Sequence, residues 1–400
     1  MSSTTVGVVV IALLVVHVAV MGAFHALYWR RRGRHLVTEG DGRAPSRCSI
    51  GLVSVLKPLA GYDEDLDDNL ASFAKQDGVA YEIVFGCASP LDPALEAARR
   101  FIARHPEVAA TIVITDPSTT LNRKVAQLVA MARAARGDVL VTSDSNVRVG
   151  HDYLRSLVEP LRDRSCGLVT NLIAGTGERS IGAALENLQL SGYVAPSVVL
   201  STLAMPVTIG KSLAVRRDDL DALGGFERFG CVLAEDYAMG RAFADAGFSI
   251  ATSLSAVENR HRKVSILASY DRHARWAKLR RVTVPWAFAL EPFFTPLFVA
   301  TAGALIAPAP LTVALVGVAV VVQTATTFIA AWAVRGHPLP FRYLPVELLR
   351  TAILGAVWLS ACVSRTVTWR GHTFVLGRGS VIAPVAITEA AEANEAGVVL

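Results

Sequence analysis

The feature that most constrains this chain is a long stretch near its start without a single charged residue. It runs from Val6 to Tyr28, and a helix of that length, rising about 1.5 Å per residue, crosses a hydrocarbon core of roughly 30 Å. A cleaved signal peptide is the alternative, but its positive charges would precede a shorter apolar core. Here the positive charges follow, at Arg30, Arg31, Arg32 and Arg34. We therefore predict a transmembrane helix with its N-terminus outside and the following residues in the cytoplasm.

The composition of the 400 residues agrees with a membrane protein. Hydrophobic residues make up 52% of the chain and charged residues 18%, which is too apolar for an ordinary soluble protein. The net charge of +5 is too small and too dispersed for a nucleic-acid surface, so no nucleic-acid partner is expected. The cysteines are odd in number and include no CxxC pair, which argues against a disulfide framework or a zinc site and favours a reducing compartment. They are Cys48, Cys87, Cys166, Cys231 and Cys362.

The region from His35 to Val284 has a mixed composition in which short β-branched runs alternate with amphipathic stretches. Alternating strands and helices are typical of a parallel α/β sheet. The expected strands are Leu52–Leu56, Glu82–Gly86, Thr111–Thr115 and Val139–Thr142, and the expected helices are Leu66–Lys75, Pro93–His105 and Asn122–Arg136. We divide the chain into an anchor with its basic flank (1–34), a domain (35–284), C-terminal membrane helices (285–365) and a C-terminal tail (366–400).

The chain becomes apolar again after Val284, with candidate spans at Phe293–Ala307, Leu311–Val334 and Val346–Val363. Prolines interrupt the first, which favours an interfacial helix joined to a short span. Two or three C-terminal spans are therefore possible. Three would place the tail outside, whereas three of its basic residues favour the cytoplasm: Arg365, Arg370 and Arg378. The last stretch, Glu389–Leu400, is acidic and rich in alanine and is predicted to be disordered.

Three acids follow apolar segments of the domain. Asp144 lies in the Ser143-Asp144-Ser145-Asn146 segment that follows the strand Val139–Thr142, Asp92 follows the strand Glu82–Gly86, and Asp236 lies in Leu-Ala-Glu-Asp-Tyr. Ligands of open α/β sheets bind outside the carboxyl ends of the strands, so these positions suit functional carboxylates. The alternative is a helix cap or a turn residue, and Asp92 before Pro93 fits an N-cap with Pro at the first helical position.

Transfer of a sugar from a nucleotide diphosphate could use these acids. The diphosphate needs Mg²⁺ or Mn²⁺ held by one or two protein carboxylates, a role that suits Asp144. Inversion at the sugar needs a base for the acceptor hydroxyl, a role that suits Asp236. Farther along, Arg272, Arg275 and Trp276 fall on one helical face, where the guanidinium groups could stabilise a departing diphosphate. A basic juxtamembrane helix with an interfacial Trp is the alternative.

The ordered motifs resemble the family of ceramide glucosyltransferases. They are Leu56-Lys57-Pro58-Leu59, the acid of the Leu-Asp-Pro-Ala segment, Asp144-Ser145-Asn146, Gly210-Lys211-Ser212, Ala234-Glu235-Asp236-Tyr237 and the RxxRW run that ends at Trp276. The resemblance implies a Rossmann-like GT-A domain that binds a UDP-sugar, with Asp236 as general base. It also implies a donor site made of Asp92, Asp144, Lys124, Arg272, Arg275 and Trp276, and a divalent metal, Mg²⁺ or Mn²⁺, on Asp144.

Asn146 departs from the wider GT-A pattern, which commonly has an acid at that point, so the metal is expected to depend mainly on Asp144 and the diphosphate. The chain also looks like the enzymes that add a hexosamine to hopanoid lipids, so the acceptor is ceramide or a hopanoid. The nearly uncharged segment Tyr193–Ile209 could form a lipid-facing wall for it, or a segment of the core. The resemblance implies a multi-pass membrane enzyme, in the inner membrane if the source is bacterial, with a cytoplasmic catalytic domain.

Two other classes of protein remain possible. A processive polysaccharide synthase carries a similar domain, but synthases generally need more spans and usually have QxxRW where this chain has RxxRW. A transporter or receptor with a cytoplasmic nucleotide-binding domain is the non-enzymatic option. Transporters place ionisable groups within their spans, and among the candidate spans we note only Arg350, near a helix end.

Overall fold

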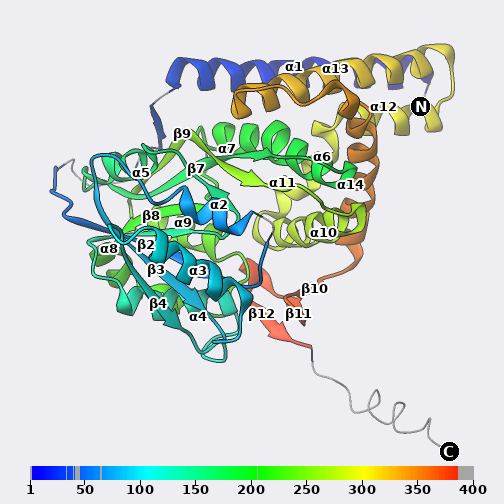
Figure 1. Ribbon diagram of the computed structural model, residues 1–400. Helices are drawn as coiled ribbons and strands as arrows, with labels where there is room; N and C mark the ends of the chain where they lie inside the picture. The colour runs from blue at the N-terminus through cyan, green and yellow to red at the C-terminus, as the bar shows by residue number, and fades with distance from the viewer. Residues whose placement is uncertain are drawn as a thin grey trace, which may run out of the picture.

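A mixed nine-stranded sheet forms the centre of the domain in the computed structural model, which describes residues 2–32, 34–38, 40, 46–63, 65–204 and 206–385. The strand order is β1-β9-β7-β8-β5-β2-β3-β4, with β6 paired to β9. Figure 1 shows the sheet within the domain, below the long helices α1 (Ser3–Arg31) and α13 (Pro310–Arg335). The strands are β1 (His35–Val37), β2 (Leu52–Leu59), β3 (Ala80–Cys87), β4 (Ala109–Ile114), β5 (Val139–Ser143), β6 (Val147–Arg148), β7 (Cys166–Thr176), β8 (Ser212–Arg216) and β9 (Ser249–Arg260).

The predicted parallel pairing is confirmed for the strands from which it was inferred. β2 pairs in parallel with β3 and β5, and β3 pairs in parallel with β4. The rest of the sheet is mixed, because β8 runs antiparallel to both β5 and β7. Ser143 at the end of β5 lies opposite Ser212 at the start of β8. The antiparallel strand therefore brings the residues before Ser212 to the carboxyl end of β5.

Helices cover both faces of the sheet because successive residues of its strands point to opposite sides. Val55 of β2 packs with Leu157 on the face covered by α2 (Leu66–Ala71), α3 (Pro93–Arg104) and α5 (Tyr153–Leu161). Leu56 packs with Phe243 on the face covered by α4 (Arg123–Ala134), α8 (Arg217–Ala222) and α9 (Glu235–Asp245). α2 is shorter than the predicted helix Leu66–Lys75, since the chain tightens into turns after Ala71.

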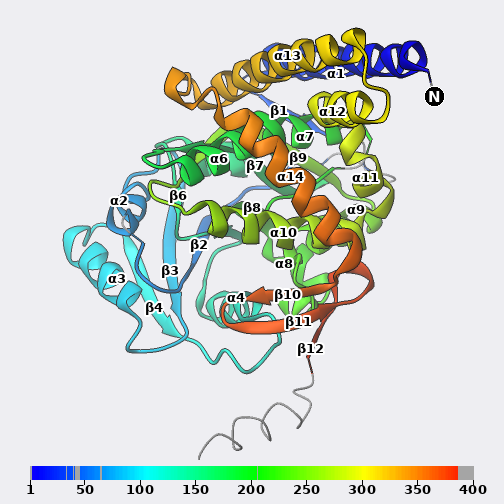
Figure 2. The ribbon, with the colours of Figure 1, turned by 90° about the vertical axis from the view of Figure 1, so that its right-hand side faces the viewer.

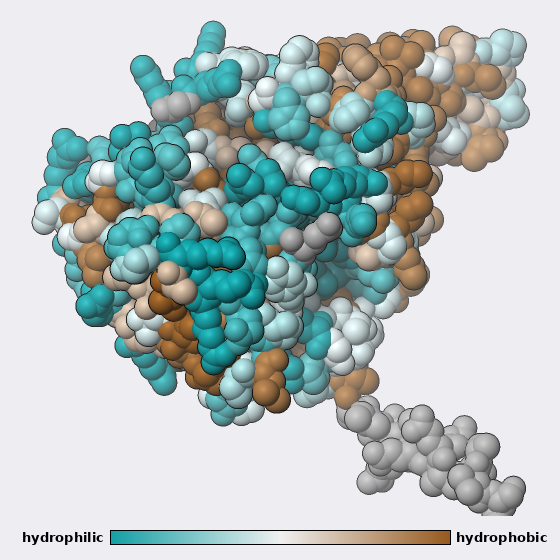
Figure 3. Space-filling view, in the orientation of Figure 1, coloured by the Kyte–Doolittle hydropathy of each residue, from teal (hydrophilic) through white to brown (hydrophobic). Residues whose placement is uncertain are grey.

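Three helices are long and apolar enough to cross a membrane among the described residues. They are α1 (Ser3–Arg31), α13 (Pro310–Arg335) and the segment Phe341–Val363, which contains α14 (Val346–Val363). A fourth candidate is a pair of shorter segments, Pro285–Phe294 and Pro296–Ile306, bent by 71°. This pair contains α11 (Pro285–Leu290), the 3₁₀ turn η3 (Glu291–Phe294) and α12 (Pro296–Ile306). Figure 3 shows apolar surface gathered around α1, α12 and α13.

The contacts between these helices give their relative directions. Near its start α1 places Gly7 close to Leu311, farther along His17 bonds to Thr326 at 2.8 Å, and near its end the Tyr28 hydroxyl donates to the Ala333 carbonyl at 3.1 Å. α1 and α13 therefore run in parallel. α12 runs the opposite way, because Leu297 at its start contacts Gln323 in the middle of α13 while Gly303, toward its end, lies against Val6.

Both ends of α14 lie against the domain. Near its start Val346 packs with Ala184 and Leu185 of α6 (Ile181–Gln189). Toward its end the Ala361 carbonyl accepts a hydrogen bond from Arg281 of α10 (Ile266–Thr283). Figure 2 shows α14 passing diagonally across the same side of the molecule as α10.

α14 also carries a fully buried carboxylate, Glu347, which the sequence analysis passed over. It pairs with Arg350 at 2.6 Å, and Arg350 reaches Gln189 of the domain at 2.5 Å. Glu347 therefore neutralises Arg350, the charged residue predicted in this candidate span, at the junction with the domain.

The first part of the predicted C-terminal tail is instead a three-stranded sheet that packs on the domain. It consists of β10 (Thr366–Trp369), β11 (His372–Leu376) and β12 (Ile382–Pro384). Val367, Phe374, Leu376 and Ile382 bury their side chains against Leu233 of the domain. Alternating apolar residues on such short strands gave no clear signal beside the long apolar helices. The segment predicted to be disordered, Glu389–Leu400, lies outside the described residues.

Candidate active site

Asp144 lies between two lysines at the carboxyl end of β5. Lys124, in the first turn of α4, approaches one carboxylate oxygen at 3.0 Å, and Lys211, directly before β8, approaches the other at 3.0 Å. Asn122 fixes the start of α4 because its side chain accepts hydrogen bonds from the backbone of Lys124 and Val125. Burial would raise the pKa of Asp144, but the two ammonium groups outweigh it and hold the pKa well below its usual range.

Lys57 holds the backbone of the segment that contains Asp144. It is fully buried at the end of β2, donates to the Asp144 carbonyl at 2.7 Å and lies over the Phe73 ring at 4.1 Å. Burial lowers its pKa to about 7, and the charge of Asp144 partly opposes that shift. The lysine of the Leu-Lys-Pro-Leu motif therefore holds the backbone of Asp144 in place.

The oxygen atoms around Lys211 suit a hard cation. Its ammonium group lies 2.9 Å from Oδ1 of Asn146 and 3.0 Å from a carboxylate oxygen of Asp144. The two oxygens already hold a positive charge between them, and carboxylate and amide oxygens are ligands for Mg²⁺ and Mn²⁺. The described residues contain no cluster of three or more His, Cys, Asp or Glu side chains that could hold a metal. A cation here would thus take Asp144 and Asn146 from the protein and its other ligands from the substrate.

Asp236 lies in the first turn of α9, beside the start of β8. One carboxylate oxygen accepts from the Gly210 backbone at 2.5 Å, and the other accepts from the Tyr237 backbone at 2.8 Å. A side chain at Gly210 would meet the carboxylate of Asp236 at 2.9 Å, so glycine alone leaves room for it. Burial raises the pKa of Asp236 to about 6, with a further rise from the Glu235 carboxylate and an opposing effect of Lys124.

Lys124 connects the two predicted acids. Besides Asp144 it contacts Glu235 at 2.9 Å and the Gly210 carbonyl at 3.2 Å. The structure therefore brings Asp144, Lys124 and Asp236 into one site. Asp92 is placed differently: its carboxylate accepts from the Ala94 backbone at 2.9 Å, as the N-cap of α3, and from the Gly61 backbone at 3.0 Å. Its role in donor binding stays a prediction.

The RxxRW run lies on α10, as the sequence predicted. Arg272 contacts the fully buried carboxylate of Glu186 at 2.9 Å and the His261 ring at 2.8 Å. Burial and the neighbouring Arg272 charge lower the pKa of His261 to about 3, so its ring is neutral. His273 also contacts Glu186, at 3.2 Å. Arg272 is therefore held in one orientation from two sides.

Arg275 and Trp276 follow on the same helix. Trp276 packs partly buried against the core of the domain and edge-on to His273, with the ring centroids 5.4 Å apart. Burial and the charge of Arg272 lower the pKa of Arg275, and Glu186 opposes them. The described residues offer Arg275 no ion pair within 4.0 Å. Its positive charge is available to an anion.

Several residues of the site escaped the sequence analysis. Lys57 and Lys211 were quoted only as parts of motifs, and Glu186 and His261 were not singled out. Glu186 carried a usable signal, since it is the only acid between Arg179 and Asp218. No sequence pattern marked Lys211 or His261. Antiparallel β8 brings Lys211 to Asp144, and the end of β9 brings His261 to Arg272.

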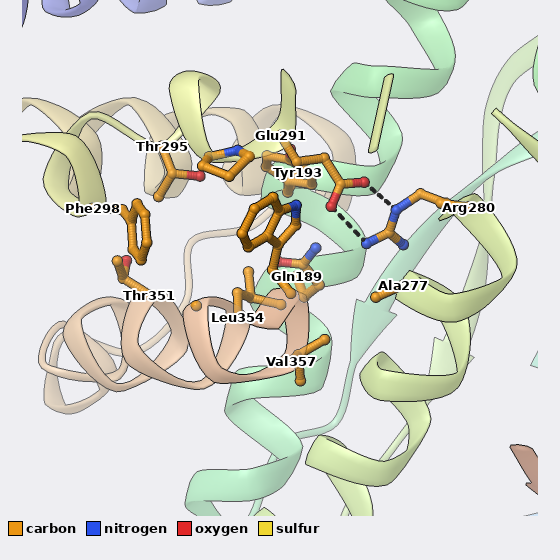
Figure 4. Close-up of a pocket in the computed structure, with 13 residues that line it drawn as sticks. Gln189, Tyr193, Ala277, Arg280, Glu291, Thr295, Phe298, Thr351, Leu354 and Val357 are labelled. Atoms are coloured by element: carbon orange, nitrogen blue, oxygen red, sulfur yellow. Dashed lines mark hydrogen bonds and ion pairs between the residues drawn. The ribbon is translucent and has the colours of Figure 1, made fainter. Parts of the chain in front are cut away.

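A separate, partly open pocket lies between the domain and the membrane helices (Figure 4). Its polar wall contains the Arg280–Glu291 ion pair, Gln189 and Tyr193. Its apolar wall comes from α12 and α14 and includes Phe298, Leu354, Val357 and Trp358. Arg280 lies four residues beyond Trp276, so α10 borders the cavity and carries the RxxRW run. Within the segment Tyr193–Ile209, Ala195, Val198 and Val199 are buried in a hydrophobic cluster that also contains Phe24 of α1, whereas Leu203 is exposed.

A mixed α/β sheet with acids and lysines at its strand ends, an arginine-bearing helix and attached apolar helices defines a membrane glycosyltransferase of the GT-A fold. The chain belongs to glycosyl transferase family 21, whose profile matches residues 10–382.

Two curated relatives are similar over nearly the whole chain. Ceramide glucosyltransferase 1 of Caenorhabditis elegans is 27% identical over 92% of this chain and 78% of its own length. Ceramide glucosyltransferase 3 of the same organism is 26% identical over 94% of this chain and 81% of its own length. Among solved structures, the mannosyltransferase PcManGT from Pyrobaculum calidifontis, in complex with GDP-Man and Mn²⁺, is 20% identical, with a TM-score of 0.49 over 90% of this chain and 98% of that one.

Proposed function

We propose that this protein transfers one glucose from UDP-glucose to a hydroxyl group of ceramide, with inversion at the sugar. The observation that carries the proposal is the site in which Lys124 joins the carboxylate of Asp144 to the segment of Asp236. The choice of glucose and ceramide is supported by the two relatives named as ceramide glucosyltransferases.

In this proposal the donor's diphosphate binds between the end of β5 and α10. Asp144 and Asn146 would hold Mg²⁺ or Mn²⁺, which when bound supplies positive charge to the diphosphate. Lys211 contacts the same two oxygens, so its ammonium group would lie beside the diphosphate and add positive charge to it. Arg272 and Arg275 add charge on the other side of the leaving group. Asp92 and Trp276 complete the proposed donor site.

Asp236 acts as the base. The acceptor oxygen forms a bond to the anomeric carbon while the bond from that carbon to the diphosphate oxygen breaks. The hydroxyl proton passes to Asp236, and UDP departs with the electron pair of the broken bond. With a pKa of about 6, Asp236 is ionised at neutral pH yet close enough to the working pH to accept a proton.

The cavity beside α10 suits the lipid acceptor. Its apolar side is built from α12 and α14, where a lipid chain would remain in contact with the membrane, and its polar side faces the domain. Tyr193 is the residue of the predicted lipid-facing segment that lines it. An acceptor in this cavity would extend its hydroxyl along α10 toward the donor.

We further propose that α1, the bent pair containing α12, and α13 cross the membrane, whereas α14 lies along its surface. Since α13 runs parallel to α1, it begins on the side where α1 begins, so the bent pair must carry the chain across. α14 starts and ends at the domain. This arrangement puts Arg365, Arg370 and Arg378 on the side of the domain, which the arginines after α1 place in the cytoplasm.

The experiment that tests the function uses the purified full chain in detergent with Mn²⁺, UDP-glucose and ceramide. We expect mass spectrometry to detect glucosylceramide and UDP in equal amounts, and Asp236→Asn to form neither above background. If a product formed only from UDP-N-acetylglucosamine and a hopanoid, these would be the donor and the acceptor in place of UDP-glucose and ceramide. A polymer would show a processive synthase, and failure to release UDP with any of these substrates would contradict the proposal.

A further inference from the structure

The turn between β10 and β11 has an unusual residue at its tip. Trp369 pairs with His372, so Arg370 and Gly371 alone form the loop. Both have positive φ angles, 48° and 80°. A two-residue turn of this kind is usually Asn-Gly or Gly-Gly, because a side chain such as that of arginine disfavours the left-handed region. An arginine held there against its backbone preference points to a use of its side chain.

The hairpin is fixed to the two segments that carry the active-site residues. Ser380 accepts from the backbone of Leu233 at 3.0 Å and of Ala234 at 3.2 Å, immediately before Glu235 and Asp236. At the other side, Lys278 of α10 donates to the Thr366 carbonyl at 2.8 Å. The C-terminal sheet thus joins the start of α9 to the helix of the RxxRW run.

The guanidinium group of Arg370 is within electrostatic range of Asp144, Asp92 and Glu235, and it lies over the neighbouring Trp369. Its guanidinium carbon is 5.4 Å from the centre of the Trp369 ring. The residue is exposed, so a ligand can reach it. Partial desolvation of its guanidinium group lowers the pKa of Arg370, while the charges of Asp144, Asp92 and Glu235 oppose that shift. The charge of Arg370 in turn contributes to the lowered pKa of Arg275. No carboxylate of the described residues lies within 4.0 Å of either guanidinium group.

We propose that Arg370 is a donor-binding residue whose guanidinium group contacts the diphosphate of the nucleotide sugar together with Arg275. Two arginines on separate elements that are within electrostatic range of each other would suit a multivalent anion, and the planar guanidinium group suits two phosphate oxygens. The nearby carboxylates do not neutralise the two arginines, since Asp144 is bound by two lysines and Asp92 caps a helix. This inference rests on the proposed function. It makes the segment after the last apolar helix part of the active site.

The test compares UDP with UMP, which lacks the second phosphate. The variant Arg370→Asn creates the Asn-Gly pair that the turn prefers, so the hairpin should remain folded. Calorimetry of the full chain in detergent with Mn²⁺ gives the dissociation constants of both nucleotides. We expect Arg370→Asn to weaken UDP binding by roughly 10- to 100-fold, the usual effect of losing a charge-assisted hydrogen bond, and to change UMP binding much less. The dissociation constant of UDP for Arg370→Lys should lie between that of the unchanged protein and that of Arg370→Asn.

Arg378→Ala is the matched control, because Arg378 is another exposed arginine of the same C-terminal sheet. It should keep the ratio of UMP to UDP dissociation constants found for the unchanged protein. Equal UDP binding by Arg370→Asn and the unchanged protein would overturn the inference and leave the proposed function intact. An equal loss of UDP and UMP binding would also overturn it, since that pattern indicates a structural role. If the unchanged protein binds no UDP, the proposed function fails and the inference with it.

Discussion

The ammonium group of Lys124 lies 3.0 Å from Asp144, and this ion pair joins the end of β5 to the start of α4. The same group lies 2.9 Å from Glu235, the residue before Asp236. Lys124 therefore acts on both acids: together with Lys211 it lowers the pKa of Asp144, and it limits the rise in the pKa of Asp236 that burial and Glu235 cause.

Replacing Asp144 should affect the donor most. Asp144→Ala removes a carboxylate that we assign to the cation and leaves Lys124 and Lys211 without their shared partner. We expect weaker binding of UDP-glucose in the presence of Mn²⁺ and no detectable transfer. Calorimetry and a transfer assay measure the two effects. Near-normal activity of the variant would remove Asp144 from the metal site.

Replacing Lys124 should shift the pH dependence of turnover. Asp236 serves as a base only when ionised, so the turnover number should fall as the pH drops through its pKa of about 6. Lys124 lowers that pKa, so Lys124→Gln should raise it and move the fall in activity to a higher pH.

The measurement is the turnover number from pH 5 to 8 at saturating donor. Lys211→Gln serves as the control because Lys211 contacts Asp144 and is not among the groups that shift the pKa of Asp236. The same shift in both variants would show that Asp236 does not determine this part of the profile.

Glu186 is expected to position Arg272. Glu186→Gln removes the buried negative charge that holds Arg272 and His273. We expect the turnover number to fall roughly 10- to 100-fold, together with a lower melting temperature. Glu82→Gln is the matched control, since Glu82 is a buried carboxylate of β3 that pairs with Arg136 at 2.7 Å. It should lose stability but keep the turnover number of the folded protein, and an equal loss of turnover in both variants would exclude a positioning role.

Labelling of introduced cysteines tests the membrane arrangement. In a chain without its native cysteines, Pro308→Cys should react with an impermeant reagent from outside the cell. His337→Cys and Arg378→Cys should react only after permeabilisation, because the end of α13 and the C-terminal sheet lie on the side of the domain. Labelling of Arg378→Cys from outside would mean that α14 crosses the membrane.

The sequence predicted the parts of the site that depend on local patterns. Asp144 could be located because an acid directly after a buried strand reaches the carboxyl edge of the sheet, and Arg272, Arg275 and Trp276 because helical spacing puts them on one face. Contacts between distant segments could not be predicted. Lys211 reaches Asp144 only because β8 is antiparallel to β5, and Arg370 reaches the donor site only because both ends of α14 return to the domain.

For the membrane helices, too, local sequence patterns were predictive and contacts between distant segments were not. The apolar runs and the prolines predicted α1, α13 and the bent segment around α12. Length and composition also made α14 a candidate span, and they carry no information on where its two ends lie. The contacts of Val346 with α6 and of Ala361 with Arg281 supply it. The side of the C-terminal tail therefore follows from tertiary contacts rather than from a count of apolar runs.

The central claim is that Asp236 takes the proton of the acceptor as the glycosidic bond forms. The most direct measurement determines, for Asp236→Asn, both the dissociation constant of UDP-glucose and the rate of transfer to ceramide. A base acts mainly in the transition state, so we predict nearly unchanged donor binding and a turnover lower by roughly 10² to 10⁴. If donor binding instead weakened in proportion to the lost rate, Asp236 would be a donor-binding residue and the account of the base would be wrong.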